Sequence, residues 1–496
     1  MLDAKDDAEE SMRHLKALRL LTCRPGKPPI ATMLAAKTPT YLMEVLSISP
    51  AHAKEAAWAL SNLAAGTPEQ TSELLSTGAG VVMRTLLHED NEELAHTAVW
   101  GLANMAGDGP AVRDQVLECG VLPRLIELLR MELSDIPTMN LVVGANEGAT
   151  TLEQMLPHTP AQKQLAELLA STRPTNNDSQ SYLSAIRAAL PEAREQLYRN
   201  RLVSQHVTTT SSPPGAKAGE GSAQFWQIYS GMMGDTTGTG TTGTGTTGTG
   251  MTTGTALSQE RHAHLQREDE NRAVLARVLT RKKRERISTL VWCLLNLCRG
   301  KPHPPFAAVS PCIPALLEVL GKLGLDMHMS TAVVDAAWAI AYLCEDTTVL
   351  EDVLAHNPLP VLLSLVMETS PRQLVFRPLV RLLGNFTVGD SSVTRELVKH
   401  GAVDLFMYLT NGANGWLVRE SLWALSNLAA SDEAHVHFLL GRGVHTLLVQ
   451  LLRSQRLDAR QAGEAKFVLA NMIEIGRVGD VEEVKRVAAD FLPNLP

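Results

Sequence analysis

Aromatic rings and asparagines recur one helical turn apart along this sequence, at positions that share one face of an α-helix. An Asn amide has one acceptor oxygen and two N–H donors, so it can pair with both main-chain groups of an extended peptide. Slots between successive indoles can hold the aliphatic stem of Lys or Arg, with a cation–π attraction of about 0.5–2 kcal/mol. The pairs are Trp58/Asn62, Trp100/Asn104, Trp292/Asn296, Trp423/Asn427 and the weaker Phe467/Asn471, and Trp338/Tyr342 and Arg381/Asn385 fill the gaps in the series. This series, called the ladder below, predicts a surface that binds cationic peptides.

A single tryptophan on an Ala/Leu-rich helix is more typical of a packed core than of a binding site. The asparagines favour the binding site. Asn is a poor residue in the middle of a helix, and burying it without a partner costs about 1–3 kcal/mol. Its repetition one turn after an aromatic residue therefore indicates an open groove.

The ladder positions recur at intervals of roughly 42–46 residues, except between Trp100 and Trp292. A period in this range is typical of armadillo and HEAT arrays, in which each unit of two or three helices packs against its neighbours. WD40 propellers share the period, but their strands need an alternation of apolar and polar residues that this sequence lacks. We predict an all-α, right-handed armadillo-repeat superhelical solenoid of about eight repeats.

The irregular interval predicts a long insertion in the array. We expect armadillo repeats 1–3 in residues 1–130, the insertion in residues 131–286 and repeats 4–8 in residues 287–496. Inside the insertion, helices are expected from Ser179 to Val207 and from about Ser258, on either side of a Gly/Thr tract that cannot build a core. Insertions in solenoids map to surface loops, so the array should resume across this one.

Composition limits the class of protein. The chain has 496 residues, of which 45% are hydrophobic, and none of its apolar runs approaches the about 20 residues that a membrane span needs. Met1 is followed by acidic residues rather than by a signal peptide. A net charge of -8 argues against direct nucleic-acid binding and favours a cationic partner. The cysteines lack CxxC spacing and are predicted to be reduced core residues: Cys23, Cys119, Cys293, Cys298, Cys312 and Cys344.

The sequence does not predict an enzyme. Phosphate-loop, HExxH and GxSxG motifs do not occur in it. His52, His96 and His158 have no other ligands at metal-binding spacing, and His435 and His437 are two residues apart and do not share a helix face. We therefore expect surface histidines, no catalytic residue, no metal and no cofactor.

Seven tracts resemble the importin-α (karyopherin-α) family of armadillo receptors for nuclear localisation signals. HLKALRLLTCRPGKPPI is similar to the first repeat of that family, and AAWALSNLAAGTPEQT and AVWGLANMAGDGPAVRD to the second and third. WCLLNLCRGKPHPP, AAWAIAYLCED, VRLLGNFTVG and ESLWALSNLAA are similar to the fourth, fifth, sixth and seventh. The tracts agree in order over about 350 residues, as expected of one array. The resemblance implies import of proteins into the nucleus, binding of Lys/Arg-rich signals in a concave groove, and a location in cytoplasm and nucleus.

The resemblance implies two peptide-binding sites. In the family one pocket holds a lysine ammonium with a glycine carbonyl, a threonine and an aspartate, and the matching residues here are Gly66, Thr71 and Asp108. The implied major site comprises Trp58, Asn62, Gly66, Thr71, Trp100, Asn104, Asp108, Trp292, Asn296 and Arg299. The implied minor site comprises Trp338, Tyr342, Arg381, Asn385, Glu420, Trp423, Asn427, Glu464 and Asn471, with Phe467 in place of the expected Trp.

Importin-β is a further partner implied by the resemblance, but the sequence lacks a recognisable basic segment for it and the family's last repeats. The alternative is therefore a divergent armadillo scaffold or a cargo-sequestering protein that is not coupled to importin-β. The run RKKRER, residues 281–286, itself resembles a nuclear localisation signal. It is either a solvated helix face or an internal ligand on a long tether that competes with cargo for the groove.

Overall fold

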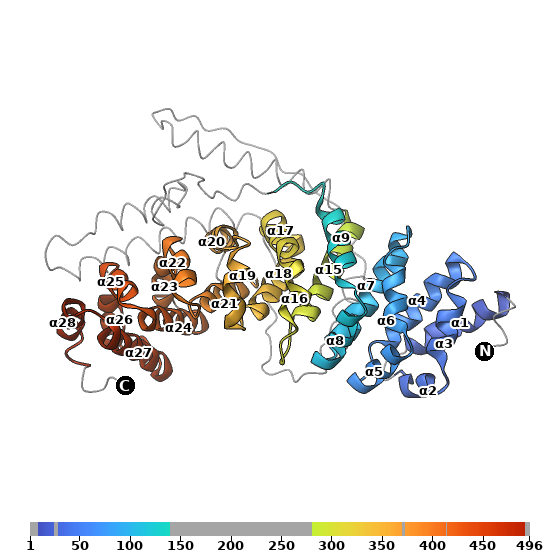
Figure 1. Cartoon of the computed structure of the whole chain (residues 1–496), viewed down its shortest axis with the longest axis horizontal. Coiled ribbons are helices and arrows are strands. Elements are labelled where there is room, and N and C mark those ends of the chain that lie inside the picture. Colours follow the sequence, from blue (N-terminus) through green and yellow to red (C-terminus); the bar gives the residue numbers. More distant parts are fainter. Residues whose placement is uncertain (1–7, 24–27, 139–279, 370–372, 413, 492–496) are drawn as a thin grey trace, which may run out of the picture. The chain divides into compact units, whose positions relative to one another are not determined.

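The computed structural model describes residues 8–23, 28–138, 280–369, 373–412 and 414–491. All regular structure in these residues is helical (Figure 1). The helices expected from Ser179 and from Ser258, and the Gly/Thr tract between them, lie outside the described residues.

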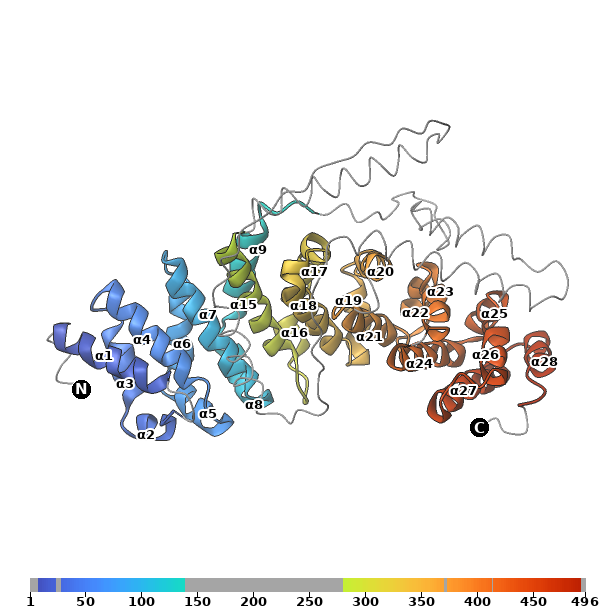
Figure 2. The same cartoon turned by 180° about the vertical axis from the view of Figure 1, so that it is seen from behind.

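The helices form repeated units of a short first, a second and a longer third helix, which is the predicted armadillo-repeat solenoid (Figures 1 and 2). The units in the first half are α2 (Ile30–Ala35), α3 (Thr38–Val45) and α4 (Pro50–Leu63); α5 (Pro68–Ser76), α6 (Ala79–Leu86) and α7 (Glu92–Gly107); and α8 (Pro110–Glu118), α9 (Leu122–Leu133) and α15 (Arg281–Cys298). Those in the second half are α16 (Phe306–Val309), η2 (Ser310–Cys312), α17 (Ile313–Leu323), η3 (Met327–Met329) and α18 (Ser330–Leu343); η4 (Thr347–Val349), α19 (Leu350–Leu354), α20 (Leu359–Glu368) and α21 (Phe376–Phe386); α22 (Ser391–Lys399), α23 (Ala402–Thr410) and α24 (Gly415–Ser431); and α25 (Glu433–Gly441), α26 (Val444–Arg453) and α27 (Ala459–Ile475). A further third-type helix, α1 (Ala8–Thr22), precedes them, and α28 (Val478–Val487) follows.

Each third helix packs directly on the third helix of the next unit, so α1, α4, α7, α15, α18, α21, α24 and α27 form a continuous row. We call it the third-helix row. Local sequence fixes where its members begin, because Asn91, Asn414 and Asp458 are N-cap residues whose side chains accept main-chain N–H groups. Gly78 and Gly401 adopt φ values of 90° and 83° at the turn between a first and a second helix, a conformation that disfavours side chains.

The core lies on the side of the row opposite to the ladder. The residue two positions after each ladder aromatic is fully buried, as at Leu60, Leu102, Leu294, Ile340, Leu425 and Leu469. Two residues correspond to about 200° around a helix. The aromatic residues of the ladder are therefore on the opposite side of these helices, whereas the ladder asparagines Asn296 and Asn385 are themselves buried.

The helices before and after residues 139–279 pack on one another, and their contacts show where the array is interrupted. Helix α15 packs on α9, α8 and α7, so α8, α9 and α15 are the three helices of one unit. Residues 139–279 thus enter between the second and the third helix of a single repeat. The expected insertion, 131–286, includes the last residues of α9 and the first turns of α15.

Two predictions about side-chain burial need correction. Cys293, Cys298, Cys312 and Cys344 are buried, but Cys23 is exposed and Cys119 is only partly buried, because both lie at the ends of helices rather than on their apolar faces. Of the histidines expected at the surface, His52 and His435 are buried. His52 Nδ1 lies 2.7 Å from the Ser49 hydroxyl, and His435 Nδ1 lies 2.7 Å from Asp432 Oδ1.

One helical run in the described residues, Phe306–Leu323, is long and apolar enough to cross a membrane by length and composition. The pair of helical segments Thr347–Leu354 and Leu359–Glu368 passes the same test only if counted as one bent span. Half of the Phe306–Leu323 run is buried inside the protein, where α17 packs against α9, α18 and α20. The run is accounted for as part of the helical core.

Candidate peptide-binding groove

The third-helix row carries the whole ladder on consecutive helices. Trp58 is the most accessible of its tryptophans, with 38% of its surface exposed, and Phe467 near the other end is 49% exposed. The tryptophans between them, on α7, α15, α18 and α24, are partly buried. Because adjacent third helices are in contact, the ladder positions of neighbouring repeats lie side by side.

The asparagines are tied to the preceding third helix. Nδ2 of Asn104, Asn296, Asn385 and Asn471 donates to a main-chain carbonyl of that helix, over 3.1, 2.9, 3.0 and 3.1 Å. Nδ2 of Asn427 donates instead to the Thr387 hydroxyl, and that of Asn62 to the Thr22 hydroxyl. One donor of each amide is therefore already used between repeats, which explains how buried asparagines are tolerated here. The amide oxygens are not used in these bonds, and Oδ1 of Asn296 is buried without a hydrogen-bond partner.

Thr71 and Asp108, on the first helix and at the end of the third helix of one unit, are brought into direct contact. Asp108 is the C-cap residue of α7, and the fully buried Thr71 of α5 donates its hydroxyl proton to Asp108 Oδ2. Burial raises the pKa of Asp108 to about 6, although the Thr71 hydrogen bond and the charge of Arg299 both lower it. The carboxylate is thus poorly solvated, and no Lys, Arg or His of the described residues forms an ion pair with it.

Gly66 lies in the connection between α4 and α5, immediately before the N-cap residue Thr67. A Cβ atom at this position would come within 2.7 Å of Gln70 Oε1, the atom that accepts the Thr67 main-chain N–H. Glycine here therefore avoids a contact with the side chain that completes the capping box of α5. The Thr71–Asp108 hydrogen bond joins two of the three expected pocket residues, and the part of Gly66 in the pocket stays a prediction.

Arg299 and Asp335 extend the site towards α18. Arg299 Nη2 donates to the Gly107 carbonyl over 3.1 Å, one residue before Asp108. Burial raises the pKa of Asp335 to about 7, an effect that the charge of Arg299 opposes. Sequence reasoning did not single out Asp335, although a signal was available. An acidic residue stands three positions before the ladder aromatic in several repeats, as Glu55, Asp335, Glu420 and Glu464.

The slot expected between Trp100 and Trp292 is closed. Their ring centroids lie 5.3 Å apart with an interplanar angle of 49°, which is direct aromatic contact. An alkyl chain needs about 3.5–4 Å of separation from each ring, so it does not fit between them in this arrangement. Trp338 stacks on Tyr342 of its own helix, with centroids 5.5 Å apart.

The residues of the implied minor site also contact one another. Arg381 Nη2 lies 3.0 Å from Glu420 Oε1, and its guanidinium lies over the Trp423 ring at 5.6 Å. Burial raises the pKa of Glu420, although the neighbouring Arg381 and Arg419 charges lower it. A second pair of this kind, which the ladder did not predict, is Arg377 over Trp416 at 5.5 Å. At the other end of the row, Arg19 lies over Trp58 at 5.8 Å.

The basic run 281–286 forms the first turns of α15 and is held by acidic side chains. Lys282 contacts Glu93, Lys283 contacts Asp135, and Arg286 contacts both Glu92 and Glu132. Arg281 and Lys282 are 69% and 76% exposed, so this part of the run is a solvated helix face, and Arg281 pairs with Glu285 of the same helix. Lys283 and Arg286 are largely covered and are paired with acids on α7, on α9 and just after α9. The run belongs to the folded repeat rather than to a free tether.

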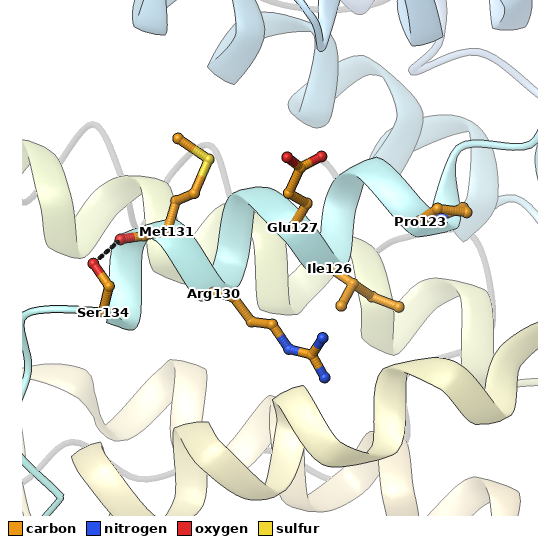
Figure 3. Close-up of a pocket in the computed structure, with 6 residues that line it drawn as sticks. All are labelled: Pro123, Ile126, Glu127, Arg130, Met131 and Ser134. Carbon is orange, nitrogen blue, oxygen red and sulfur yellow. Dashed lines mark hydrogen bonds between the residues drawn. The ribbon is translucent and has the colours of Figure 1, made fainter.

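A cavity of about 530 Å³ lies over α9, away from the third-helix row (Figure 3). Its lining residues all come from that helix and its C-cap: Pro123, Ile126, Glu127, Arg130, Met131 and Ser134. In the described part of the chain, no group of three or more His, Cys, Asp or Glu residues could hold a metal ion.

Comparison with known proteins supports a distant relationship to importin-α. No family model matches the chain. Importin subunit alpha-1a of Oryza sativa subsp. japonica is 28% identical over 173 residues, which are 34% of this chain and 32% of the rice protein. Importin subunit alpha-2 of Arabidopsis thaliana is 35% identical over 126 residues, 25% of this chain and 24% of that protein. The chain thus spans about a third or less of the length of these relatives, and the homology covers about a third of the chain.

Two solved structures superpose on the chain at low identity. An engineered protein has a TM-score of 0.48 at 18% identity, with 99% of this chain and 95% of that chain covered. A designed armadillo repeat protein in complex with the peptide (KR)4 has a TM-score of 0.43 at 15% identity, with 78% of this chain and 98% of that chain covered.

Proposed function

We propose that the chain is an importin-α-like receptor that binds Lys/Arg-rich nuclear localisation signals along its third-helix row for import into the nucleus. The observation that carries the proposal is the Thr71–Asp108 pair. A carboxylate whose pKa is raised to about 6 by burial, with no cation paired to it, gains most from a ligand that supplies a positive charge. A lysine ammonium fits, because it donates to carboxylate, hydroxyl and carbonyl oxygens together.

The rest of the major site would act on the same ligand. The amide oxygen of Asn104 would accept a peptide N–H group, since its Nδ2 atom is oriented by a bond to the preceding helix. Oδ1 of Asn296 is buried, so it can accept one only after the side chains that cover it move. Trp58 would cover an aliphatic stem. Binding a second stem between Trp100 and Trp292 requires one indole to rotate away from the other, because their rings are in contact.

Fluorescence anisotropy with a labelled Lys-rich localisation peptide tests the proposal. Asp108→Asn keeps the acceptor for Thr71 but removes the charge, and it should weaken binding by about one to two orders of magnitude, as expected for a charged hydrogen bond worth about 1.5–3 kcal/mol. Asp108→Lys and the double variant Trp100→Ala/Asn104→Ala should abolish binding. Asp352→Asn, an exposed carboxylate on the first-type helix α19, serves as the matched control. Affinity that is indifferent to Asp108 would contradict the proposal.

A second candidate is a divergent armadillo scaffold, or a protein that only sequesters basic peptides. The closed Trp100–Trp292 slot favours it. Import would place the protein in cytoplasm and nucleus and would require a carrier, for which importin-β is the candidate. A pull-down of importin-β by the peptide-loaded chain separates a receptor coupled to import from a scaffold. Neither candidate includes a catalytic step or a cofactor.

A further inference from the structure

Two arginines on α21 and α24, Arg377 and Arg419, differ from three other cations of the third-helix row that pair with acids. Arg19 contacts Glu55, Lys54 contacts Glu93, and Arg381 contacts Glu420, at 2.9, 2.7 and 3.0 Å respectively. Within the described residues, no carboxylate lies within ion-pair distance of Arg377 or Arg419. Their charges are therefore free for a ligand.

Arg377 and Arg419 are near the start of two helices that pack on each other. Arg377 is one turn before Arg381 on α21, and Arg419 is one turn before Trp423 on α24. The stacking of Arg381 on Trp423, at 5.6 Å, fixes these two helices against each other. We therefore expect Arg377 and Arg419 on neighbouring turns of the packed pair, with Arg377 placed over Trp416.

Trp416 orients one of these arginines. It lies two turns before Trp423, on the same helix face, and the Arg377 guanidinium is held over its ring at 5.5 Å. A guanidinium stacked on an aromatic face keeps its N–H donors in its own plane, where they can bind a carboxylate with two parallel hydrogen bonds. Glu420 pairs through Oε1 with Arg381, and its Oε2 is buried without a hydrogen-bond partner, so neither oxygen is bonded to Arg377 or Arg419.

The distance to the Asp108 pocket sets the length of a ligand that reaches both places. Asp108 ends α7, and the row then continues through α15 and α18 to α21. Packed helices are about 8–10 Å apart, so three steps are about 30 Å. An extended peptide covers this with about nine residues at about 3.3 Å each.

We propose that Arg377, Trp416 and Arg419 form a site for the carboxylate of an Asp or Glu residue in the bound peptide. The ligand then combines a basic segment at the Asp108 end of the row with an acidic residue about nine positions away. The second basic cluster implied for the minor site would be disfavoured at this point by the unpaired positive charges. This inference rests on the proposed function for its ligand, but the site itself can be tested without it.

The test compares two labelled peptides on the full chain at low salt. Both peptides carry the same Lys-rich segment and a nine-residue Gly/Ser spacer. The spacer leads to Asp-Glu-Asp in the acidic peptide and to Asn-Gln-Asn in the neutral one. Each peptide is made twice, with its three segments in forward and in reverse order. In one of the two orders, the acidic peptide should bind about tenfold more tightly than the neutral peptide, which corresponds to about 1.4 kcal/mol of binding free energy. Arg377→Ala/Arg419→Ala should remove this advantage, whereas Arg395→Ala, on the first-type helix α22, should keep it.

An Asp/Glu-rich peptide without the basic segment is titrated in parallel. Equal binding of the two long peptides in both directions overturns the inference while leaving the proposed function intact. A second outcome is that the basic segment does not bind, whereas the acidic peptide binds and its binding is lost in Arg377→Ala/Arg419→Ala. The proposed function then fails and the acidic-residue site stands. If neither binds, both are overturned.

Discussion

Replacing Glu132 by Gln tests how the split repeat is held together. Glu132 on α9 accepts two N–H groups of Arg286 on α15, from Nε and, over 3.1 Å, from Nη2. The first turn of α15 carries basic residues and no acid, and positive charge at a helix N-terminus opposes the helix dipole. These first turns therefore depend on acids from other helices. Without Glu132, Arg286 keeps only the contact with Glu92, at 3.0 Å.

The size of the effect follows from the burial of the pair. The side chains of Arg286 and Glu132 are 21% and 17% exposed, so the ion pair is partly buried and only partly screened by solvent. A hydrogen bond to a charged group contributes about 1.5–3 kcal/mol, and the remaining Glu92 contact puts the loss near the lower end, at about 1.5–2 kcal/mol. Since about 1.36 kcal/mol corresponds to a factor of ten, the open population of α15 should rise about 10- to 30-fold.

Thiol labelling of the full chain under native conditions measures this opening. Cys293 in the middle of α15 is fully buried, and burial raises the pKa of its thiol, so it reacts only when the helix opens. Glu132→Gln should increase its labelling rate about 10- to 30-fold at about 0.1 M ionic strength. The increase should shrink at about 1 M salt, where the screening length falls from about 10 Å to about 3 Å. The exposed Cys23 is the internal reference.

Glu127→Gln is the matched control, because Glu127 is on the same helix but pairs with Arg124 of α9 itself, at 2.8 Å. It should leave the Cys293 rate unchanged. Two results would refute the view that ion pairs hold the split repeat closed. One is a Cys293 labelling rate in Glu132→Gln that equals the wild-type rate, and the other is an equal rise of this rate in the control.

Three further predictions concern the groove. The affinity for a Lys-rich peptide should rise between pH 5 and pH 8, because the carboxyls of Asp108 and Asp335, with pKa values of about 6 and about 7, attract cations only when ionised; a flat profile in anisotropy titrations would contradict this. Asp335→Asn should raise the free energy of unfolding at pH 8 but not at pH 4. Because the pKa of this carboxyl is raised in the folded state, its protonated form contributes stability below about pH 4, the pKa in the unfolded chain. This contribution is lost as pH rises through about 7. Urea denaturation at the two pH values measures this. An unchanged free energy of unfolding at pH 8 would mean that burying the Asp335 charge does not destabilise the fold. Asn104→Ala removes the donation to the Ser61 carbonyl, over 3.1 Å, and should lower the free energy of unfolding by about 1 kcal/mol in the same assay; an unchanged value would mean that the bond adds nothing.

The repeat could be predicted from the sequence because each unit carries its signal locally. An aromatic residue, a fully buried aliphatic residue two positions later and an amide after four define one helix with two faces, as at Trp58, Leu60 and Asn62. The place of the interruption could not be predicted in the same way. Residues 281–286 form the first turns of α15, where Lys282 and Arg286 pair with acids on α7 and α9 through contacts that join residues more than a hundred positions apart in the chain.

The candidate site was predictable in its residue types but not in its internal bonds. The contact of Thr71 with Asp108 was implied only by the family resemblance, since it joins the first helix of a unit to the end of its third helix, 37 positions along the chain. The rotamers that close Trp100 on Trp292 depend on packing between α7 and α15 and leave no trace in the sequence. Asp335 could have been found, because its position three residues before the aromatic recurs along the ladder.

The internal contacts of the row change what determines affinity for a ligand. Arg19 and Arg381 already stack on tryptophans and pair with acids, so a ligand cation that displaces them exchanges one contact for a similar one and gains little net free energy. Asp108 and Arg377 have no ion-pair partner among the described residues, and a ligand charge placed on them adds an interaction without breaking one. A ligand gains net free energy only from contacts that do not replace existing ones. These unpaired groups should therefore determine how tightly the row binds a peptide and which spacing of charges it recognises. The ladder tryptophans and asparagines would then position the peptide, and the unpaired charges would select it.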